Sequence, residues 1–255
     1  MKNALKEKLI QGKPVFGTMI TTGCVDIAEI ISYTGVDFIM IDCEHGSVGI
    51  ETAGRMVSLI KNIQVTPLLR VSCNEMSPIQ SSLNTGIYGI MIPNVSTKEE
   101  AVKAIQFCKY PPVGIRGVGP NRAVLFGTGA DEFSDYYSTA NDEILVIAQI
   151  EHYDAVENID DILSVPGIDI AFIGQRDLCM SMGIPGQINH PDIEKSCFKV
   201  VEACKKYNII PGIVTSHGSI EKHLNMGFKF LQCGTDSSFL YNGIKQVVNE
   251  FKSYI

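Results

Sequence analysis

Eight short runs of apolar and β-branched residues recur along the chain, and their number limits the possible folds more than any other feature of the sequence. Most of these runs are continuously apolar and do not alternate with polar residues. Strands that are covered on both faces have this pattern, whereas strands with one face in water alternate. The runs therefore predict buried strands at 16–20, 36–41, 66–71, 88–92, 145–150, 169–173, 209–214 and 228–232.

Stretches with apolar residues three and four positions apart lie between the runs and predict helices, among them 25–33, 53–60, 98–108 and 192–207. Glycines mark several expected helix-to-strand turns, at Gly35, Gly86, Gly167 and Gly227. Thr97, followed by two glutamates, predicts a helix N-cap. Eight strand–helix units in 255 residues predict a (β/α)8 TIM barrel, formed as one domain by residues 1–255. An open doubly wound sheet is the alternative, but no GxGxxG motif follows the first strand.

Residues 110–141 interrupt the regular alternation. The interval contains "YPPVGIRGVGPNRA" and then "FGTGADEFSDYY", and it is too long for an ordinary connection. Loops of this length are usually functional or oligomeric. Its glycine-rich part lacks the preceding strand and the following helix that a phosphate loop requires. We therefore expect a loop that packs near the mouth of the barrel, with Arg116 shaping it.

The composition disfavours two classes of partner. A net charge of −7 without a run of lysine and arginine argues against nucleic acid and against an anionic membrane surface. No stretch approaches the roughly 20 apolar residues of a membrane span, and the first residues, MKNALKEK, lack the apolar stretch of a signal peptide. The eight cysteines form no CxxC pair, which favours reduced thiols. We expect a cytoplasmic protein.

Polar side chains follow five of the predicted strands at the same end. In a TIM barrel the active site lies at the C-terminal ends of the strands. Any one of these residues alone is more often structural, but five strands that end alike indicate a site. The residues are Asp42, Glu44 and His45 after the second strand, Arg70, Asn94, Gln149 with Glu151, and Asp177.

The residue types predict enolate chemistry. Two carboxylates, Glu151 and Asp177, suit a hard divalent cation such as Mg²⁺ or Mn²⁺, which can polarise a substrate carbonyl. Arg70 can stabilise an oxyanion or bind a carboxylate through two hydrogen bonds. Histidine is the usual general base near neutral pH, which makes His45 the natural candidate. Together these groups would enolise a 2-oxo acid. No conspicuous lysine ends a strand near the cluster, which weighs against a Schiff base.

The motifs "DCEHG", "LLR", "YPPVGIRGVG", "QIE" and "FIGxxDL" occur here in the order and spacing of the HpcH/HpaI aldolase family, which the chain resembles from Phe16 to the last strand. The resemblance implies a metal-dependent class II aldolase on a TIM barrel, which reversibly cleaves a 4-hydroxy-2-oxo acid to pyruvate and an aldehyde. The family's ion would be Mg²⁺ or Mn²⁺, with Co²⁺ also possible. It further implies a cytoplasmic homohexamer, built from trimers, in which neighbours exchange the last helix.

The same resemblance assigns roles by position. His45 corresponds to the base, Arg70 to the arginine that stabilises the enolate, and Glu151 with Asp177 to the metal ligands. Gln149 corresponds to a glutamine that contacts substrate. Asp42 and Glu44 correspond to acidic residues near the metal-bound waters.

Two positions depart from the family pattern. Asn84 replaces an acid that commonly raises the basicity of the histidine, so it can orient His45 but cannot stabilise the imidazolium by charge. Arg176 replaces a small residue beside the presumed ligand Asp177. It could bind an acidic substrate, turn outward or crowd the pyruvate pocket.

Three alternatives to the aldolase remain. A lyase for malyl-CoA-like thioesters shares the fold, although the acidic charge balance disfavours a CoA-binding surface. An oxaloacetate decarboxylase would keep the same enolate step. A catalytically impaired barrel, kept for assembly or ligand sensing, is consistent with Asn84 and Arg176.

Overall fold

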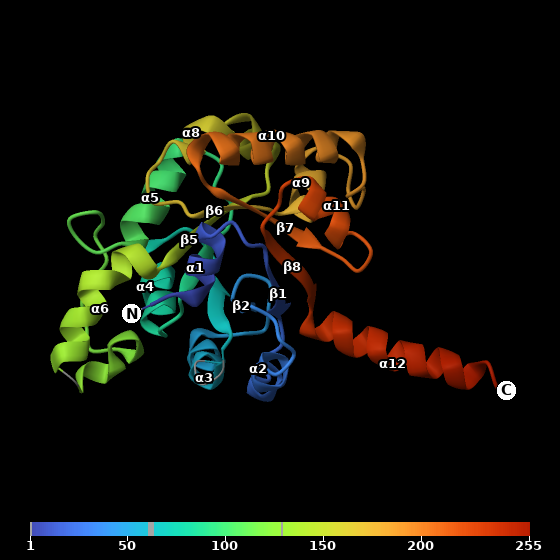
Figure 1. The fold of residues 1–255 in the computed structure, drawn as a ribbon, viewed down its shortest axis with the longest axis horizontal. Helices are drawn as coiled ribbons and strands as arrows, with labels where there is room; N and C mark the ends of the chain where they lie inside the picture. Colours follow the sequence, from blue (N-terminus) through green and yellow to red (C-terminus); the bar gives the residue numbers. More distant parts are fainter. Residues whose placement is uncertain (1, 61–63, 129) are drawn as a thin grey trace.

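The computed structural model describes residues 2–60, 64–128 and 130–255, except for the side chains of 130–134. Its centre is a closed barrel of parallel strands in which each strand pairs with the next and the last pairs with the first (Figure 1). The predicted TIM barrel and its eight strands are confirmed. The strands are β1 (Val15–Ile20), β2 (Phe38–Asp42), β3 (Thr66–Arg70), β4 (Gly89–Ile92), β5 (Leu145–Ile150), β6 (Ile170–Ile173), β7 (Ile210–Thr215) and β8 (Phe230–Thr235).

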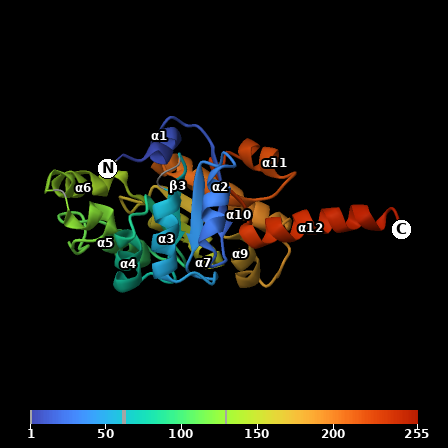
Figure 2. The same ribbon diagram turned by 90° about the horizontal axis from the view of Figure 1, so that it is seen from below.

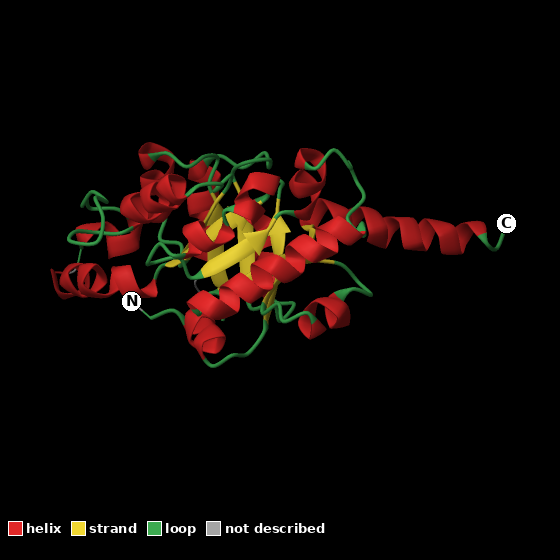
Figure 3. Ribbon diagram, turned by 90° about the horizontal axis from the view of Figure 1, so that it is seen from above, coloured by secondary structure: helices red, strands yellow, loops and turns green. Residues whose placement is uncertain are grey.

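Helices surround the barrel and follow the strands in the expected order (Figure 3). The four predicted helical stretches all form helices, and Thr97 caps one of them with a complete capping box. The four predicted turn glycines all have positive φ. The helices are α1 (Ala4–Ile10), α2 (Val25–Ser32), α3 (Ile50–Ile60), α4 (Met76–Asn84), α5 (Lys98–Cys108), α6 (Ala130–Glu143), α7 (Tyr153–Glu157), α8 (Ile159–Leu163), α9 (Gln175–Ser181), α10 (Pro191–Tyr207), α11 (Ile220–Asn225) and α12 (Asp236–Lys252).

The inside of the barrel is a packed apolar cluster to which seven of the eight strands contribute buried side chains and against which Ile210 of β7 packs. Phe230 stacks on Phe38 with ring centroids 4.2 Å apart and meets Phe172 edge-on at 6.0 Å. Leu5 and Leu9 of α1 belong to the same cluster, so α1 closes one end of the barrel. Figure 2 shows α1 at that end and α7 and α9, which follow strand ends directly, at the other. The second end is therefore the one at which a site can open.

The interval 110–141 differs from the expected loop in two ways. Its second half forms α6, preceded by the 3-10 segment η1 (Arg122–Gly127). Its first half begins near the amino ends of the strands, because the backbone N–H of Tyr110 donates to Asn141 Oδ1 at 2.7 Å, four residues before β5 begins. Arg116 is buried there, with its guanidinium 4.5 Å from the Tyr110 ring. The prediction that Arg116 shapes a loop at the barrel mouth is therefore wrong.

The last helix, α12, leaves the barrel and extends away from it (Figures 1 and 3). Only Asp236, in its first turn, is buried. One face carries exposed apolar side chains, namely Phe239, Leu240, Tyr241, Ile244, Val247, Val248 and Phe251. Despite this apolar face, no helix in the described part of the chain is long and apolar enough to cross a membrane.

Candidate active site

The predicted polar residues lie at the open end of the barrel, but they fall into two groups. Asp42 and Arg70 are the last residues of β2 and β3, which are direct neighbours in the sheet. Gln149 lies in β5, Glu151 directly follows it, and Asp177 lies in the first turn of α9, beyond β6. Two neighbouring pairs of strands therefore present an arginine group and a carboxylate group to the same opening.

The Arg70 guanidinium is held by two acids. Its Nε and Nη2 donate to the two oxygens of Asp42 at 2.9 and 2.8 Å, and its Nη1 lies 3.2 Å from Glu44 Oε2. Burial lowers the pKa of Arg70, but the hydrogen bonds and charge of Asp42, with the charge of Glu44, outweigh it and raise the pKa overall. The arginine is thus fixed in place and charged. Both Asp42 and Glu44 bind Arg70, and their predicted place near metal-bound waters stays a prediction.

His45 lies at the outer rim, on the loop after β2. Its backbone N–H donates to Asp42 Oδ1 at 3.3 Å, so the same carboxylate that holds Arg70 shapes this loop. The His45 side chain is 64% exposed, and its Nε2 lies 3.8 Å from Glu44 Oε2. The ring is therefore open to solvent and substrate, with Glu44 as its nearest acid among the described residues.

Asn84 does not contact His45 within one chain. Its Oδ1 accepts a hydrogen bond from Asn121 Nδ2 at 2.9 Å, which links the end of α4 to the segment before η1. Asn84 therefore does not make the expected pair with the His45 of its own chain.

Glu151 is buried and oriented by two donors. Its Oε1 accepts the backbone N–H of Asn94 at 2.8 Å, and its Oε2 accepts from Gln149 Nε2. Asn94 has a φ of 55°, a left-handed conformation that asparagine tolerates better than most residues. Gly174 lies against the pair, because a Cβ there would come within 2.8 Å of Glu151 Cβ. Sequence reasoning identified Asn94 as a polar strand end but could not show that its backbone, not its side chain, is used.

Carboxylates accumulate at this point. Burial raises the pKa of Glu151 to about 6, and the charges of Glu44 and Asp177 add to this. Burial also raises the pKa of Glu44, with Asp177 again contributing. A bound cation would relieve the mutual repulsion of these acids. Two carboxylate ligands with open positions suit Mg²⁺ or Mn²⁺, which keep several waters, so the residues present fit such an ion.

Arg176 lies in the first turn of α9, next to Asp177, and its side chain is exposed. It makes no ion pair with any residue that the structure describes. Its exposed guanidinium therefore leaves a cation in the turn that follows β6.

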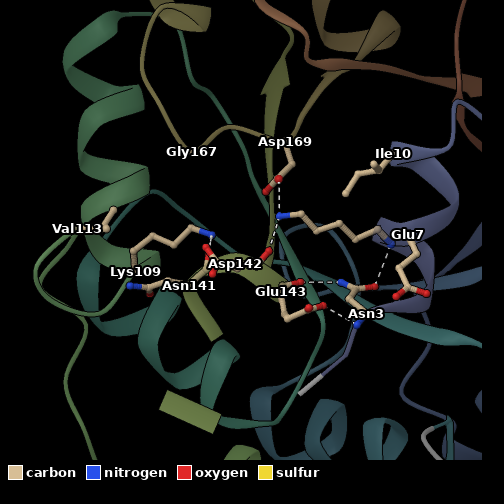
Figure 4. A pocket seen from close by; sticks show the side chains of 11 residues that line it. Asn3, Glu7, Ile10, Lys109, Val113, Asn141, Asp142, Glu143, Gly167 and Asp169 are labelled. Carbon is tan, nitrogen blue, oxygen red and sulfur yellow. Dashed lines mark hydrogen bonds and ion pairs between the residues drawn. The ribbon is translucent and has the colours of Figure 1, made fainter. Parts of the chain in front are cut away.

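A separate cavity of about 550 Å³ lies near the amino ends of the strands, away from these residues (Figure 4). Both of its lysines already have partners. Lys6 Nζ lies 2.8 Å from Asp169 Oδ1, and Lys109 Nζ donates to the Asn141 and Ile144 carbonyls. This end of a TIM barrel contributes stability more than chemistry. The candidate active site is therefore the group of residues around Arg70 and Glu151.

Comparison with known proteins identifies the family of the chain. The profile of the family described as "HpcH/HpaI aldolase/citrate lyase" matches residues 22–243. A 4-hydroxy-2-oxo-heptane-1,7-dioate aldolase from Salmonella dublin is 32% identical over 98% of this chain and 95% of its own. The crystal structure of an HpcH/HpaI aldolase from Desulfitobacterium hafniense DCB-2 superposes with a TM-score of 0.92 at 33% identity, covering 99% and 97% of the two chains. The crystal structure of the citrate synthase SbnG superposes with a TM-score of 0.88 at 26% identity, covering 98% of each chain.

The match extends over nearly the whole chain and includes every strand that carries a site residue. Its relatives are named as aldolases at an identity that establishes common descent. The chain is a carbon–carbon lyase and belongs to the HpcH/HpaI aldolase/citrate lyase family.

Proposed function

We propose that the protein is a metal-dependent class II aldolase that reversibly cleaves a 4-hydroxy-2-oxo acid to pyruvate and an aldehyde. The observation that supports this best is the fixed, charged Arg70 beside the buried carboxylate of Glu151 at one barrel opening. This arrangement can bind a 2-oxo acid and stabilise the negative charge that develops on its oxygen.

Glu151 and Asp177 would hold the divalent ion, Mg²⁺ or Mn²⁺, with Co²⁺ as a further possibility. The ion, when bound, supplies Lewis-acid polarisation of the 2-oxo group. The protein's own part is to orient Glu151 through Asn94 and Gln149, so that its carboxylate is in place before the ion arrives. Gln149 Oε1 has no hydrogen-bond partner among the described residues and is available to substrate.

In the cleavage direction, His45 would accept the proton of the substrate's C4 hydroxyl as the C3–C4 bond breaks. The electron pair of that bond moves to C3 and gives the enolate of pyruvate, while C4 leaves as the aldehyde carbon. Arg70 stabilises the enolate oxygen by hydrogen bonds that strengthen as charge develops. Protonation at C3 then releases pyruvate. An exposed imidazole at the rim suits this proton transfer with solvent.

Two further residues remain predictions. Asn84 would orient His45 only if a neighbouring copy supplied it, since in one chain it binds Asn121. Arg176, exposed and without an ion-pair partner among the described residues, would contact an anionic part of the substrate.

The function is tested by exchange of the methyl protons of pyruvate in D₂O. We expect the protein to incorporate deuterium into pyruvate with Mg²⁺ or Mn²⁺, measured by mass spectrometry, and to stop when EDTA is added. This half-reaction needs no aldehyde, so it does not depend on knowing the acceptor. Absence of exchange with any divalent ion would contradict the aldolase and favour a barrel kept for assembly or ligand sensing.

The likeness to a citrate synthase and the "citrate lyase" part of the family description keep two alternatives open. An oxaloacetate decarboxylase would release CO₂ from oxaloacetate faster than it cleaves any hydroxy-oxo acid. An acyl-CoA lyase would require a thioester substrate. Both can be assayed with the same protein preparation.

We further propose that α12 packs against a second copy in a cytoplasmic homo-oligomer, a hexamer built from trimers, and that residues 1–255 form one domain. The exposed apolar face of α12 supports the oligomer, because monomers rarely expose so continuous an apolar surface.

Placing two charges on this face is expected to break the assembly. Ile244→Asp with Val247→Asp should lower the mass measured by light scattering to that of one chain, because buried unpaired carboxylates are costly. Asn242→Asp with Asn249→Asp adds the same charge on the opposite face of the same helix and should leave the mass unchanged. Equal masses for both double variants and the parent would show that α12 does not hold the copies together.

A further inference from the structure

The barrel opening reaches down to one row of residues on β7 and β8. Val214 of β7 points inward, because Ile210 packs against the interior cluster and side chains alternate along a strand. Val214 is nevertheless 36% exposed, so the opening extends to it. Gln232 of β8 is the partner of Val214 in the ladder, and Gly17 of β1 is the partner of Gln232 on its other side. Gln232 therefore lies between an exposed valine and a position without a side chain.

The carboxamide oxygen of Gln232 is buried without a partner among the described residues. Phe230, two residues before it, belongs to the interior cluster, so Gln232 points inward above the stacked rings of Phe230 and Phe38. Gln232 is 4% exposed, and its Oε1 has no hydrogen-bond partner among the described residues. A buried polar atom without a partner is costly unless a ligand or water completes it. Gln149 and Glu151 in the candidate active site are buried to a similar degree, with 2% and 5% of their surface exposed.

The strand leaves its regular course directly after this residue. Gln232 and Thr235 pair with Gly17 and Met19, so a step of three residues on β8 matches a step of two on β1. Such bulges occur next to active sites, where they redirect side chains and end the pairing. Gln232 is thus the last inward side chain in the regular part of β8.

The position of Gln232 separates it from the groups assigned to pyruvate. Arg70, Gln149 and Glu151 come from β3 and β5, whereas β8 stands on the far side of the closed barrel, opposite β4. If pyruvate binds at Arg70, Gln149 and Glu151, the aldehyde would occupy the space above Val214 and Gln232.

The side chains of Val214 and Gln232 favour an aldehyde that carries a hydroxyl group. A carboxamide is uncharged and both donates and accepts, and a hydroxyl does the same, so the two match in either orientation of the amide. A carboxylate on the partner would find no cation on β7 or β8, whereas Arg70 and Arg176 belong to β3 and to α9, which follows β6.

We propose that Gln232 is a specificity-determining residue that binds a hydroxyl group of the aldehyde, so that the preferred acceptors are hydroxyaldehydes. The inference rests on the proposed aldolase function and adds the class of its second substrate. It assigns Gln232 no part in forming the enolate.

The test compares glycolaldehyde with acetaldehyde, which differ only by the hydroxyl group, as partners of pyruvate. Gln232→Met keeps the length of the side chain and removes the carboxamide. It is expected to lower kcat/KM for glycolaldehyde roughly tenfold, while acetaldehyde changes less than about twofold. Exchange of the pyruvate methyl protons should stay at the parent rate.

Gln80→Met is the matched control, because Gln80 on α4 also has a buried amide atom without a partner but lies outside the barrel. It should leave the ratio of the two aldehydes unchanged. An equal loss for both aldehydes in Gln232→Met, or no loss, would overturn the role of Gln232. Lack of exchange in the parent protein would instead overturn the proposed function, so the two failures are distinguishable.

Discussion

Arg70→Ala is expected to lower metal-dependent proton exchange of pyruvate by roughly 100- to 1000-fold, the loss that follows removal of a donor to a developing oxyanion. The arginine is held on three nitrogens by Asp42 and Glu44, so the direction of its donors is fixed before substrate binds. The same change leaves the almost fully buried Asp42 without its counter-charge. We therefore also expect the free energy of unfolding to fall by about 3–5 kcal/mol.

Two variants separate the chemical effect from the structural one. Arg70→Lys keeps the positive charge but loses the forked pair of donors, so it should fold and still exchange at least about tenfold more slowly. Arg116→Ala removes another buried arginine, one that packs on Tyr110 away from the site, and should leave the exchange rate of the folded protein unchanged. Equal losses of exchange in Arg70→Ala and Arg116→Ala would contradict the assigned role.

Glu151→Gln is expected to weaken Mn²⁺ binding at least about 100-fold, because it removes one of the two charged ligands. Substituting residues that only hold a ligand in place already lowers metal affinity by about 10- to 100-fold, and losing a ligand itself should cost at least as much. Binding is measured by titration calorimetry without pyruvate, so the result does not depend on turnover. Proton exchange at a fixed, low Mn²⁺ concentration should fall with the loss of binding. The substitution keeps the shape of the side chain, and its Oε1 can still accept the Asn94 N–H.

Glu44→Gln is the matched control for this prediction. Glu44 is also a buried acid whose pKa is raised, but its carboxylate contacts Arg70. It should weaken Mn²⁺ binding by less than about tenfold, through lost charge alone. Full Mn²⁺ affinity in Glu151→Gln would show that this carboxylate is not a ligand.

The sequence predicted the barrel because buried parallel strands leave a direct local signal. Every predicted run became a strand, with ends displaced by at most three residues, as at β8, predicted to end at 232 and observed to end at Thr235. The helix α6 was missed because its stability is not local. Tyr136 and Tyr137 of α6 pack edge-on against the Tyr110 ring, a contact between segments that no periodicity reveals.

The candidate site was predictable as a set of residues but not as a set of contacts. Polar strand ends identified Asp42, Arg70 and Glu151, because all strands of a parallel barrel end at the same side. That Asp42 binds Arg70 follows from the register of β2 and β3, in which the two are direct partners. Gln232 was missed although it ends the predicted run 228–232, because only the structure shows that Phe230, and with it Gln232, points into the barrel.

The pairing of β1 with β8 also governs the order in which the molecule can be made. Val15 pairs with Phe230, so the first strand waits for a partner that is synthesised 215 residues later. At ordinary rates of translation this interval is about 10–40 s. During that time the edge of β1 and the ring of Phe38 lack their final cover, and an open edge can pair with other chains. The nascent chain is therefore most exposed to misassembly just before its last strand leaves the ribosome.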